Sequence, residues 1–172
     1  FGARLISADI DGLDFTTVYC PNGKDVAHAD YPRKLQWFDD LANLWATHHR
    51  SNHDAIICGD FNVVPDAMDS WRGASAEGTM FHTQDERRRL QAILDLGLTD
   101  LFRDKFPEEQ QFSWWDYRGG AFHRGHGLRI DFILGNQSIC ARTRKIMIDR
   151  EYRKKKETLT ASDHAPVIVE LG

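Results

Sequence analysis

Asp163 and His164 are the side chains of this chain whose types and setting most directly suggest chemistry. They directly precede the run 165–171, which is apolar and β-branched and therefore predicts a buried strand. A carboxylate and an imidazole would then stand at the mouth of a rigid element, where an active site needs them. Because Asp-His pairs also occur in ordinary turns, this pair alone is weak evidence for a site.

Two further predicted strands carry polar side chains in a similar way. Asp60 and Asn62 follow the apolar run 55–59, and Asp131 lies within the apolar run 128–134. In any one of these strands, the polar residue could equally well have a structural role or belong to a functional site. The coincidence of three such strands favours a common site.

Asp131 is the most telling of these residues, because an unpaired carboxylate inside a strand costs several kcal/mol and should be paired or hydrogen-bonded. His164 is a natural partner. An Asp that accepts from one imidazole nitrogen fixes the tautomer and leaves the other nitrogen free for proton transfer. The alternative is a structural Asp131 capped by backbone amides.

Asp60 and Asn62 lie two residues apart, so both side chains would point to one side if the extended geometry persists. A carboxylate and an amide together suit a hard cation, a water molecule and a phosphate oxygen. The reaction class that fits is phosphodiester hydrolysis, with a divalent ion offsetting phosphoryl charge and an acid/base group handling water. No Cys, Ser or Lys has the setting of a covalent nucleophile, so we expect direct attack by water.

Five segments of the chain also carry a resemblance to a known family. Three of them resemble the late motifs of the endonuclease/exonuclease/phosphatase superfamily. The other two resemble the Tyr-x-Pro-Asn/Gln loop of exonuclease III-type apurinic/apyrimidinic endonucleases and the aromatic loop and strand by which exonuclease III grips DNA. The superfamily motifs are Gly59-Asp60-Phe61-Asn62, Arg129-Ile130-Asp131 and Ser162-Asp163-His164. The two motifs specific to the exonuclease III type are Tyr19-Cys20-Pro21-Asn22-Gly23 and Ser113-Trp114-Trp115-Asp116-Tyr117-Arg118, the latter followed by the segment 125–131. The resemblance runs over essentially the whole chain.

This resemblance implies a two-sheet α/β sandwich with helices outside, and an Mg²⁺- or Mn²⁺-dependent enzyme of DNA repair. Its substrates would be double-stranded DNA with abasic sites, cut on the 5′ side, and 3′ ends. The carried-over catalytic residues are Tyr19, Asp60, Asn62, Asp131 and His164; the metal residues are Asp60, Asn62, Asp163 and His164; the DNA-binding residues are Asn22, Trp114, Trp115, Arg118 and Arg129.

Within that implied site, Asp60 would activate or orient the attacking water or donate a proton, and Asn62 would position it. Tyr19 would hydrogen-bond the phosphate or protonate the leaving oxygen; the alternative is a tyrosine that packs at a strand end. The adjacent Trp114 and Trp115 would wedge into a duplex or stack on bases. Strand alternation allows the alternative that one of them is core and one exposed.

Two family motifs are not in the 172 residues: a first-strand Asn of the metal site, and a Gln-Glu-Thr segment whose Glu holds the metal. The chain therefore resembles the C-terminal two-thirds of such an enzyme, a single partial domain over 1–172 with one sheet and part of another. We expect apolar strand faces to lie open and the isolated chain to be inactive.

Composition is that of a globular protein, with 41% hydrophobic and 28% charged residues and a net charge of −4. That charge excludes coating of nucleic acid by bulk attraction, although the segment 142–156 is rich in Lys and Arg. No apolar run approaches the ~20 residues of a membrane span. The three well-separated cysteines indicate a reducing compartment. We expect a cytoplasmic monomer.

Periodicity and turn residues predict the elements that position these side chains. Asp11-Gly12 predicts a hairpin turn, Pro32 the first turn of a helix, and Gly97 the end of another. The predicted strands are 4–10, 14–20, 54–59, 112–116, 128–134, 139–149 and 165–171, and the predicted helices are 31–49 and 85–96.

Two rival functions remain at this point. One keeps the fold and changes the substrate to lipid or inositol phosphates, against which the aromatic segment 113–118 speaks. The other is a catalytically inactive nucleic-acid-binding relative. The retained acids and imidazole speak against it, whereas the unseen Asn and Glu motifs leave it open.

Overall fold

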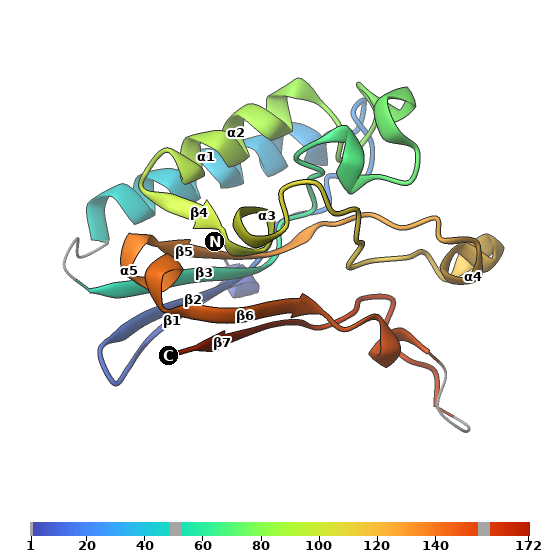
Figure 1. The fold of residues 1–172 in the computed structure, drawn as a ribbon. Coiled ribbons are helices and arrows are strands. Elements are labelled where there is room, and N and C mark those ends of the chain that lie inside the picture. The colour runs from blue at the N-terminus through green and yellow to red at the C-terminus, as the bar shows by residue number, and fades with distance from the viewer. Residues whose placement is uncertain (1, 49–52, 155–158) are drawn as a thin grey trace.

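A five-stranded sheet lies at the centre of the structure, a computed structural model that describes residues 2–48, 53–154 and 159–172 (Figure 1). Its strand order is β1-β2-β3-β5-β4. β2 and β3 pair in parallel, and the remaining neighbours pair antiparallel. The strands are β1 (Leu5–Ile10), β2 (Leu13–Tyr19), β3 (Asp54–Asp60), β4 (Leu98–Asp100) and β5 (Asp131–Asn136).

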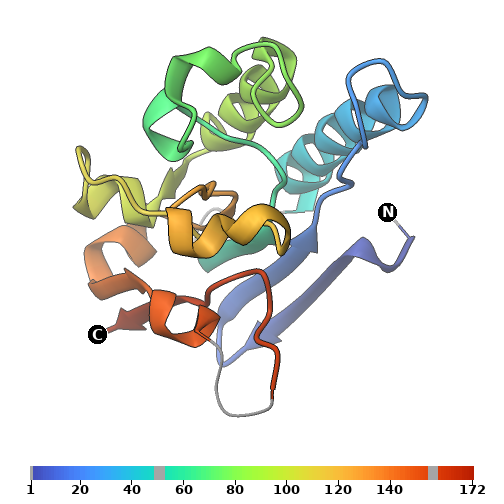
Figure 2. The same cartoon turned by 90° about the vertical axis from the view of Figure 1, so that its right-hand side faces the viewer.

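One layer flanks each face of this sheet, as Figures 1 and 2 show. The helices α1 (Asp30–His48) and α2 (Gln84–Leu94) lie side by side over one face. On the other face, β6 (Thr143–Ile148) and β7 (Val167–Leu171) form a second, antiparallel sheet. Shorter helical segments are α3 (Leu101–Lys105), α4 (Ala121–Arg124) and α5 (Gln137–Arg142), with 3-10 turns at Gly2–Arg4, Ala67–Asp69, Gly73–Ala76, Arg118–Gly120 and Arg150–Arg153.

The central strands are apolar on both sides because each face has a layer to bury. Ile57 and Phe132 pack with Phe38 of α1 in the core beneath the helices. Their strand neighbours Ile56 and Ile133 face the second sheet and pack into the core between the sheets. Alternation of side chains along a strand produces this division. The expected two-sheet α/β sandwich with helices outside is therefore confirmed.

Most predicted elements are present with small shifts of boundary. The hairpin turn has Asp11 at φ 50° and Gly12 at φ 85°, the two positive angles of a type I′ turn. The predicted first helix is α1; its expected end at His49 lies outside the described residues. The second helix begins with a capping box between Thr83 and Glu86.

Three predicted strands were wrong in part. Residues 137–142 form α5 before the strand β6 begins, because the Asn136 side chain caps the helix by accepting from the amide of Ile139. The segment 112–116 forms isolated bridges through Trp114 to Leu128 and His164 instead of a strand. The predicted strand 128–134 begins only at Asp131, and the short elements β4 and α3 were missed.

Strand ends bring the candidate side chains together. Tyr19 is in register with Asp60 in the pair β2–β3, and Asp60 with Asp131 in the pair β3–β5. Because side chains alternate, Asp60 shares its face with Ile56, and Asp131 shares its face with Ile133, so both carboxylates face the second sheet. Gly59, at φ 136°, permits this approach: a Cβ there would lie 2.0 Å from the carbonyl oxygen of Val18.

Between the two sheets runs an apolar groove of about 500 Å³, lined among others by Phe15, Ile56 and Val167. The edge strand β1 is largely exposed, and its Ile6 and Ile10 are 69% and 52% exposed. These features agree with the expectation that apolar strand faces lie open. Among the described helices, none combines the length and the apolar character that a membrane span requires.

Candidate active site

The predicted contact between Asp131 and His164 is present. Nδ1 of His164 lies 3.0 Å and 2.9 Å from the two carboxylate oxygens of Asp131. Burial lowers the pKa of His164, but the hydrogen bond to Asp131 and the negative charges around it outweigh burial, so the pKa is raised above its ordinary value. The contact assigns the Nδ1 proton to the bond with Asp131 and leaves Nε2 available for chemistry.

Asp60 lies directly across the β3–β5 pair from Asp131. Burial, reinforced by the charge of Asp131, raises the pKa of Asp60 to about 7. Asn62 holds this carboxylate from two sides, because its backbone N–H donates to Oδ1 at 2.8 Å and its side-chain amide donates to Oδ2 at 3.0 Å. A group poised near neutrality, with a fixed orientation, suits general acid/base work.

Asn62 differs from the expected extended geometry. It has φ 50°, in the left-handed region that Asn tolerates better than most residues, and is 3% exposed. This bend turns the amide back onto Asp60, and the same amide also donates to the carbonyl of Cys20 at 2.9 Å. The predicted proximity to Asp60 holds, but it comes from a sharp turn and not from a continuing strand.

A buried ion pair supports this turn from the helical layer. Nζ of Lys34 donates to the carbonyl of Asn62 at 2.6 Å and to Oε1 of Glu86 at 2.5 Å, and both charged side chains are fully buried. A buried pair with all partners in place holds its surroundings firmly, and removal of one partner leaves an uncompensated charge. Sequence reasoning missed Lys34 and Glu86; the available signal was charged residues at core-facing positions of both helices.

Asp163 and Asp131 are held by the segment 113–114. The indole N–H of Trp114 donates to Oδ2 of Asp163 at 2.9 Å. The hydroxyl of the buried Ser113 accepts the amides of Ile130 and Asp131, both at 3.1 Å. Trp114 therefore orients a predicted metal residue, and Ser113 fixes the start of the strand that carries Asp131.

Arg129 was predicted to contact DNA, and this expectation is wrong for the structure described. Its side chain is 1% exposed. The guanidinium forms a two-pronged ion pair with Asp69 at 2.7 Å and 3.0 Å, and a third bond with Asp100 at 2.6 Å. Arg129 thus ties the loop after β3 to the segment entering β5, which is why an Arg precedes Asp131.

Trp115 was also predicted to bind DNA, and its burial contradicts that: it is 1% exposed and packs against Phe122 in the core between the sheets. The alternative, with one Trp in the core, is the correct one. Trp114 is partly buried, whereas Asn22 and Arg118 are exposed and accessible to a ligand.

Tyr19 is 52% exposed at the end of β2, with the Arg4 guanidinium 4.8 Å from the centre of its ring. An aromatic pair that sequence reasoning did not find lies at the loop surface. The Trp71 ring, 46% exposed, stacks on His126 with ring centres 3.8 Å apart. The signal that existed was Trp71 itself, which follows the loop after Asp60.

The raised pKa of His164 gives a direct test of the dyad. Because the folded pKa lies above the unfolded value of 6.5, the imidazolium stabilises the fold fully below about pH 6.5, and this contribution is lost as pH rises through the raised pKa. Asp131→Asn should lower the pKa of His164, because the variant loses the negative charge that raises it, and NMR titration of the ring nitrogens measures this. Asp104→Asn, at an exposed acid, is the control; equal pKa values in both variants would contradict the dyad.

Asp60 stabilises the fold in its neutral form, whereas His164 does so in its charged form. Its folded pKa of about 7 lies above the ordinary 3.8, so its contribution to stability is present below about pH 4 and is lost as pH rises through about 7. Wild type should therefore lose stability from pH 5 to pH 8 that Asp60→Asn does not lose. Measured in EDTA, the unfolding free energy of the variant relative to wild type should increase by roughly 1–3 kcal/mol over this range. Urea denaturation at both pH values measures this, and the same trend in Asp104→Asn would argue against it.

Comparison with known proteins finds relatives that are named as enzymes acting on DNA. The chain is 32% identical to exodeoxyribonuclease III of Haemophilus influenzae over 97% of its own length and 66% of that protein. It superposes on a Neisseria 3′ phosphatase bound to a product DNA hairpin with a TM-score of 0.93 at 34% identity, and on an AP endonuclease of Archaeoglobus fulgidus with 0.91 at 32%. In both cases 98% of this chain covers 65% of the solved chain, so the chain spans about two-thirds of its relatives' length.

A family model described as Endonuclease/Exonuclease/phosphatase matches residues 4–164, the span that contains every site residue described above. The chain belongs to the endonuclease/exonuclease/phosphatase family.

Proposed function

We propose that this protein is a metal-dependent DNA-repair phosphodiesterase of the exonuclease III type. It would remove nucleotides from 3′ ends of duplex DNA and cut on the 5′ side of abasic sites. The observation that carries the proposal is the cluster in which Asp60, Asp131 and His164 meet, with Asn62 fixing Asp60. The names of the relatives, which include exodeoxyribonuclease III and an AP endonuclease, support the same substrate class.

The donor set fits a hard divalent cation such as Mg²⁺ or Mn²⁺. Asp60 and Asp131 are neighbouring carboxylates across a strand pair, and without a cation one of them is partly protonated near neutral pH. A bound cation would relieve that repulsion and lower the pKa of Asp60. Asp60, Asn62 and Asp163, with His164 beside them, would hold the ion, whose contribution is to offset negative charge on the phosphoryl oxygens.

The chain's own residues supply the remaining chemistry. Asp60, held by two bonds from Asn62, orients a water molecule and takes its proton. His164, in the protonated form that the contact with Asp131 favours, donates from Nε2 to a phosphoryl oxygen and stabilises the negative charge that develops there. Tyr19, exposed at the neighbouring strand end, hydrogen-bonds the phosphate or protonates the leaving oxygen.

The test uses duplex DNA with one abasic site and duplex DNA with a recessed 3′ end, in Mg²⁺ with and without EDTA. The 172-residue chain is assayed alone and with the N-terminal third of the Haemophilus influenzae relative added as a separate polypeptide. We expect little cleavage by the chain alone and EDTA-sensitive cleavage by the mixture. His164→Ala in the chain should lower turnover by at least ~10² without unfolding.

Three results would each contradict one part of the proposal. Near-normal turnover of His164→Ala would remove that residue from the mechanism. Strong EDTA-sensitive cleavage by the chain alone would confirm the activity and contradict the expectation that the added segment is needed to hold the metal. If the mixture of the two polypeptides leaves DNA uncleaved and hydrolyses inositol or lipid phosphates, the rival substrate class is favoured.

Trp114 should act in two ways that substitution can separate. Trp114→Phe keeps an aromatic face but deletes the indole N–H that donates to Asp163. We expect Trp114→Phe to lower kcat about tenfold with little change in DNA affinity. Trp114→Ala should lower both kcat and DNA affinity, because it also removes base stacking worth ~1–3 kcal/mol. Steady-state kinetics and fluorescence anisotropy measure these. Trp115→Phe is the core control and should lower Tm, with DNA affinity unchanged; a Phe variant at position 114 with wild-type kcat would exclude the orienting role.

A further inference from the structure

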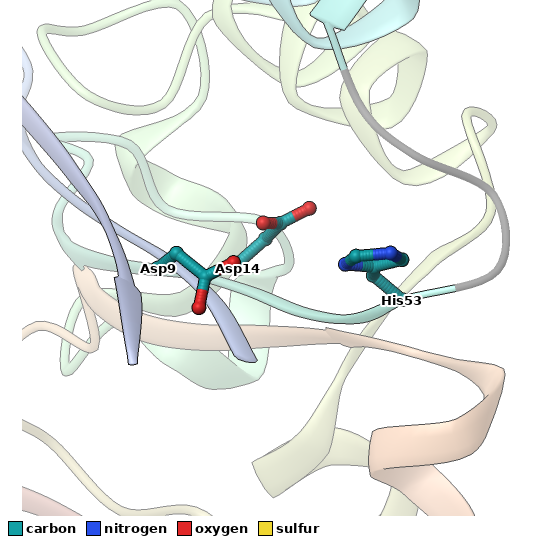
Figure 3. A group of neighbouring side chains, drawn as sticks. All are labelled: Asp9, Asp14 and His53. Carbon is teal, nitrogen blue, oxygen red and sulfur yellow. The ribbon is translucent and has the colours of Figure 1, made fainter. Parts of the chain in front are cut away.

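A second cluster of potential metal ligands lies far from the active site. Asp9, Asp14 and His53 each offer one ligand atom, and these atoms lie within 4.8 Å of one another (Figure 3). Asp9 and Asp14 come from the β1–β2 hairpin, and His53 directly precedes β3. Asp60 is at the opposite end of β3, about 20 Å away at the usual rise per strand residue.

Within the described part of the chain, no positively charged group pairs with the carboxylate of Asp9 or Asp14. Asp9 and Asp14 are directly opposite each other in the antiparallel register, where like charges destabilise a sheet. Among the described residues, the carboxylate of Asp14 has no hydrogen bond or ion pair. Asp9 accepts one backbone N–H, from Gly12 at 3.0 Å. The adjacent Asp54, by contrast, is neutralised by Arg142.

His53 supplies an independent indication of a ligand. Its Nδ1 atom is buried and has no hydrogen-bond partner among the described residues. Figure 3 shows the ring with one nitrogen directed toward Asp14. A buried ring nitrogen without a partner is costly, and a cation between it and the two carboxylates would satisfy all three groups at once.

We propose that Asp9, Asp14 and His53 bind a divalent cation of the zinc class. An imidazole nitrogen with two carboxylates suits Zn²⁺ and its late first-row neighbours, whereas Mg²⁺ and Ca²⁺ prefer oxygen ligands alone. Ligand atoms around tetrahedral Zn²⁺ are about 3.4 Å apart, as follows from bonds of about 2.0–2.2 Å. Small rotations of the two carboxylates, Asp9 being exposed, would close the present spacing.

Such an ion would clamp the hairpin to the start of β3. β1 is the edge strand and is largely exposed, so its attachment relies chiefly on pairing with β2. The ion would bridge β1, β2 and the residue before β3 at the end where the hairpin turns. It would stabilise the sheet without contact with the proposed DNA site, and this inference does not depend on the proposed function.

The test is isothermal titration of the metal-stripped 172-residue chain with ZnCl₂ in excess Mg²⁺, paired with thermal unfolding. We expect one zinc equivalent and a rise in Tm. Asp14→Asn and His53→Gln, both close in size to the native residues, should each weaken zinc affinity at least tenfold and abolish the Tm rise. Asp11→Asn, an acid of the same turn outside the cluster, is the matched control and should behave as wild type.

His164→Ala separates this site from the proposed active site, because zinc could also bind there. Zinc binding that survives His164→Ala and is lost in Asp14→Asn supports the proposal. Zinc binding that is lost in His164→Ala but retained in Asp14→Asn and His53→Gln would overturn the proposal. The absence of any zinc-dependent rise in the Tm of the wild-type chain would also overturn it. Circular dichroism in EDTA establishes that the variants are folded.

Discussion

The repulsion between Asp60 and Asp131 is the constraint on which the rest of the site depends. Antiparallel pairing of β3 and β5 sets these carboxylates opposite each other, on the face toward the second sheet. Two like charges in a partly buried position are unstable unless protonated, paired or bound to a cation. His164 pairs with Asp131 and Asn62 donates twice to Asp60, but burial, reinforced by the charge of Asp131, still raises the pKa of Asp60 to about 7.

Support for this arrangement comes from buried residues outside the cluster of Asp60, Asp131 and His164. Lys34 and Glu86 hold the turn at Asn62 from the helical layer. Arg129 joins Asp69 to Asp100 below the approach to β5. In both cases a buried charge network fixes a loop that apolar packing would leave free, and each network fails if one member is removed. The geometry of the site therefore rests on two buried charge networks.

The sequence was sufficient to predict the sandwich, the hairpin, both long helices and the Asp131–His164 contact, because each rests on local periodicity or on a motif. It misassigned Arg129 and Trp115, since a motif conveys which residues recur and not whether they face a ligand or the core. It read 139–149 as one strand, although the side chain of Asn136 starts α5 first. Lys34 and Glu86 were missed because their pairing joins residues 52 apart in the sequence, which no local pattern reports.

The position of the site at the junction of the two sheets links its chemistry to their packing. Asp60 and Asp131 come from the central sheet, whereas Asp163 and His164 lie four and three residues before the start of β7 in the second sheet. The apolar groove between the sheets reaches Gly59 and Asp131, so the same gap that separates the layers borders the carboxylates. Burial is the largest cause of the raised pKa of Asp60. A change in packing at this junction that buries Asp60 further would therefore raise its pKa further, unless a cation is bound. Sheet packing and the protonation of Asp60 are in this way linked at one junction, where the end of β3 meets Asp131 and the His164 that pairs with it.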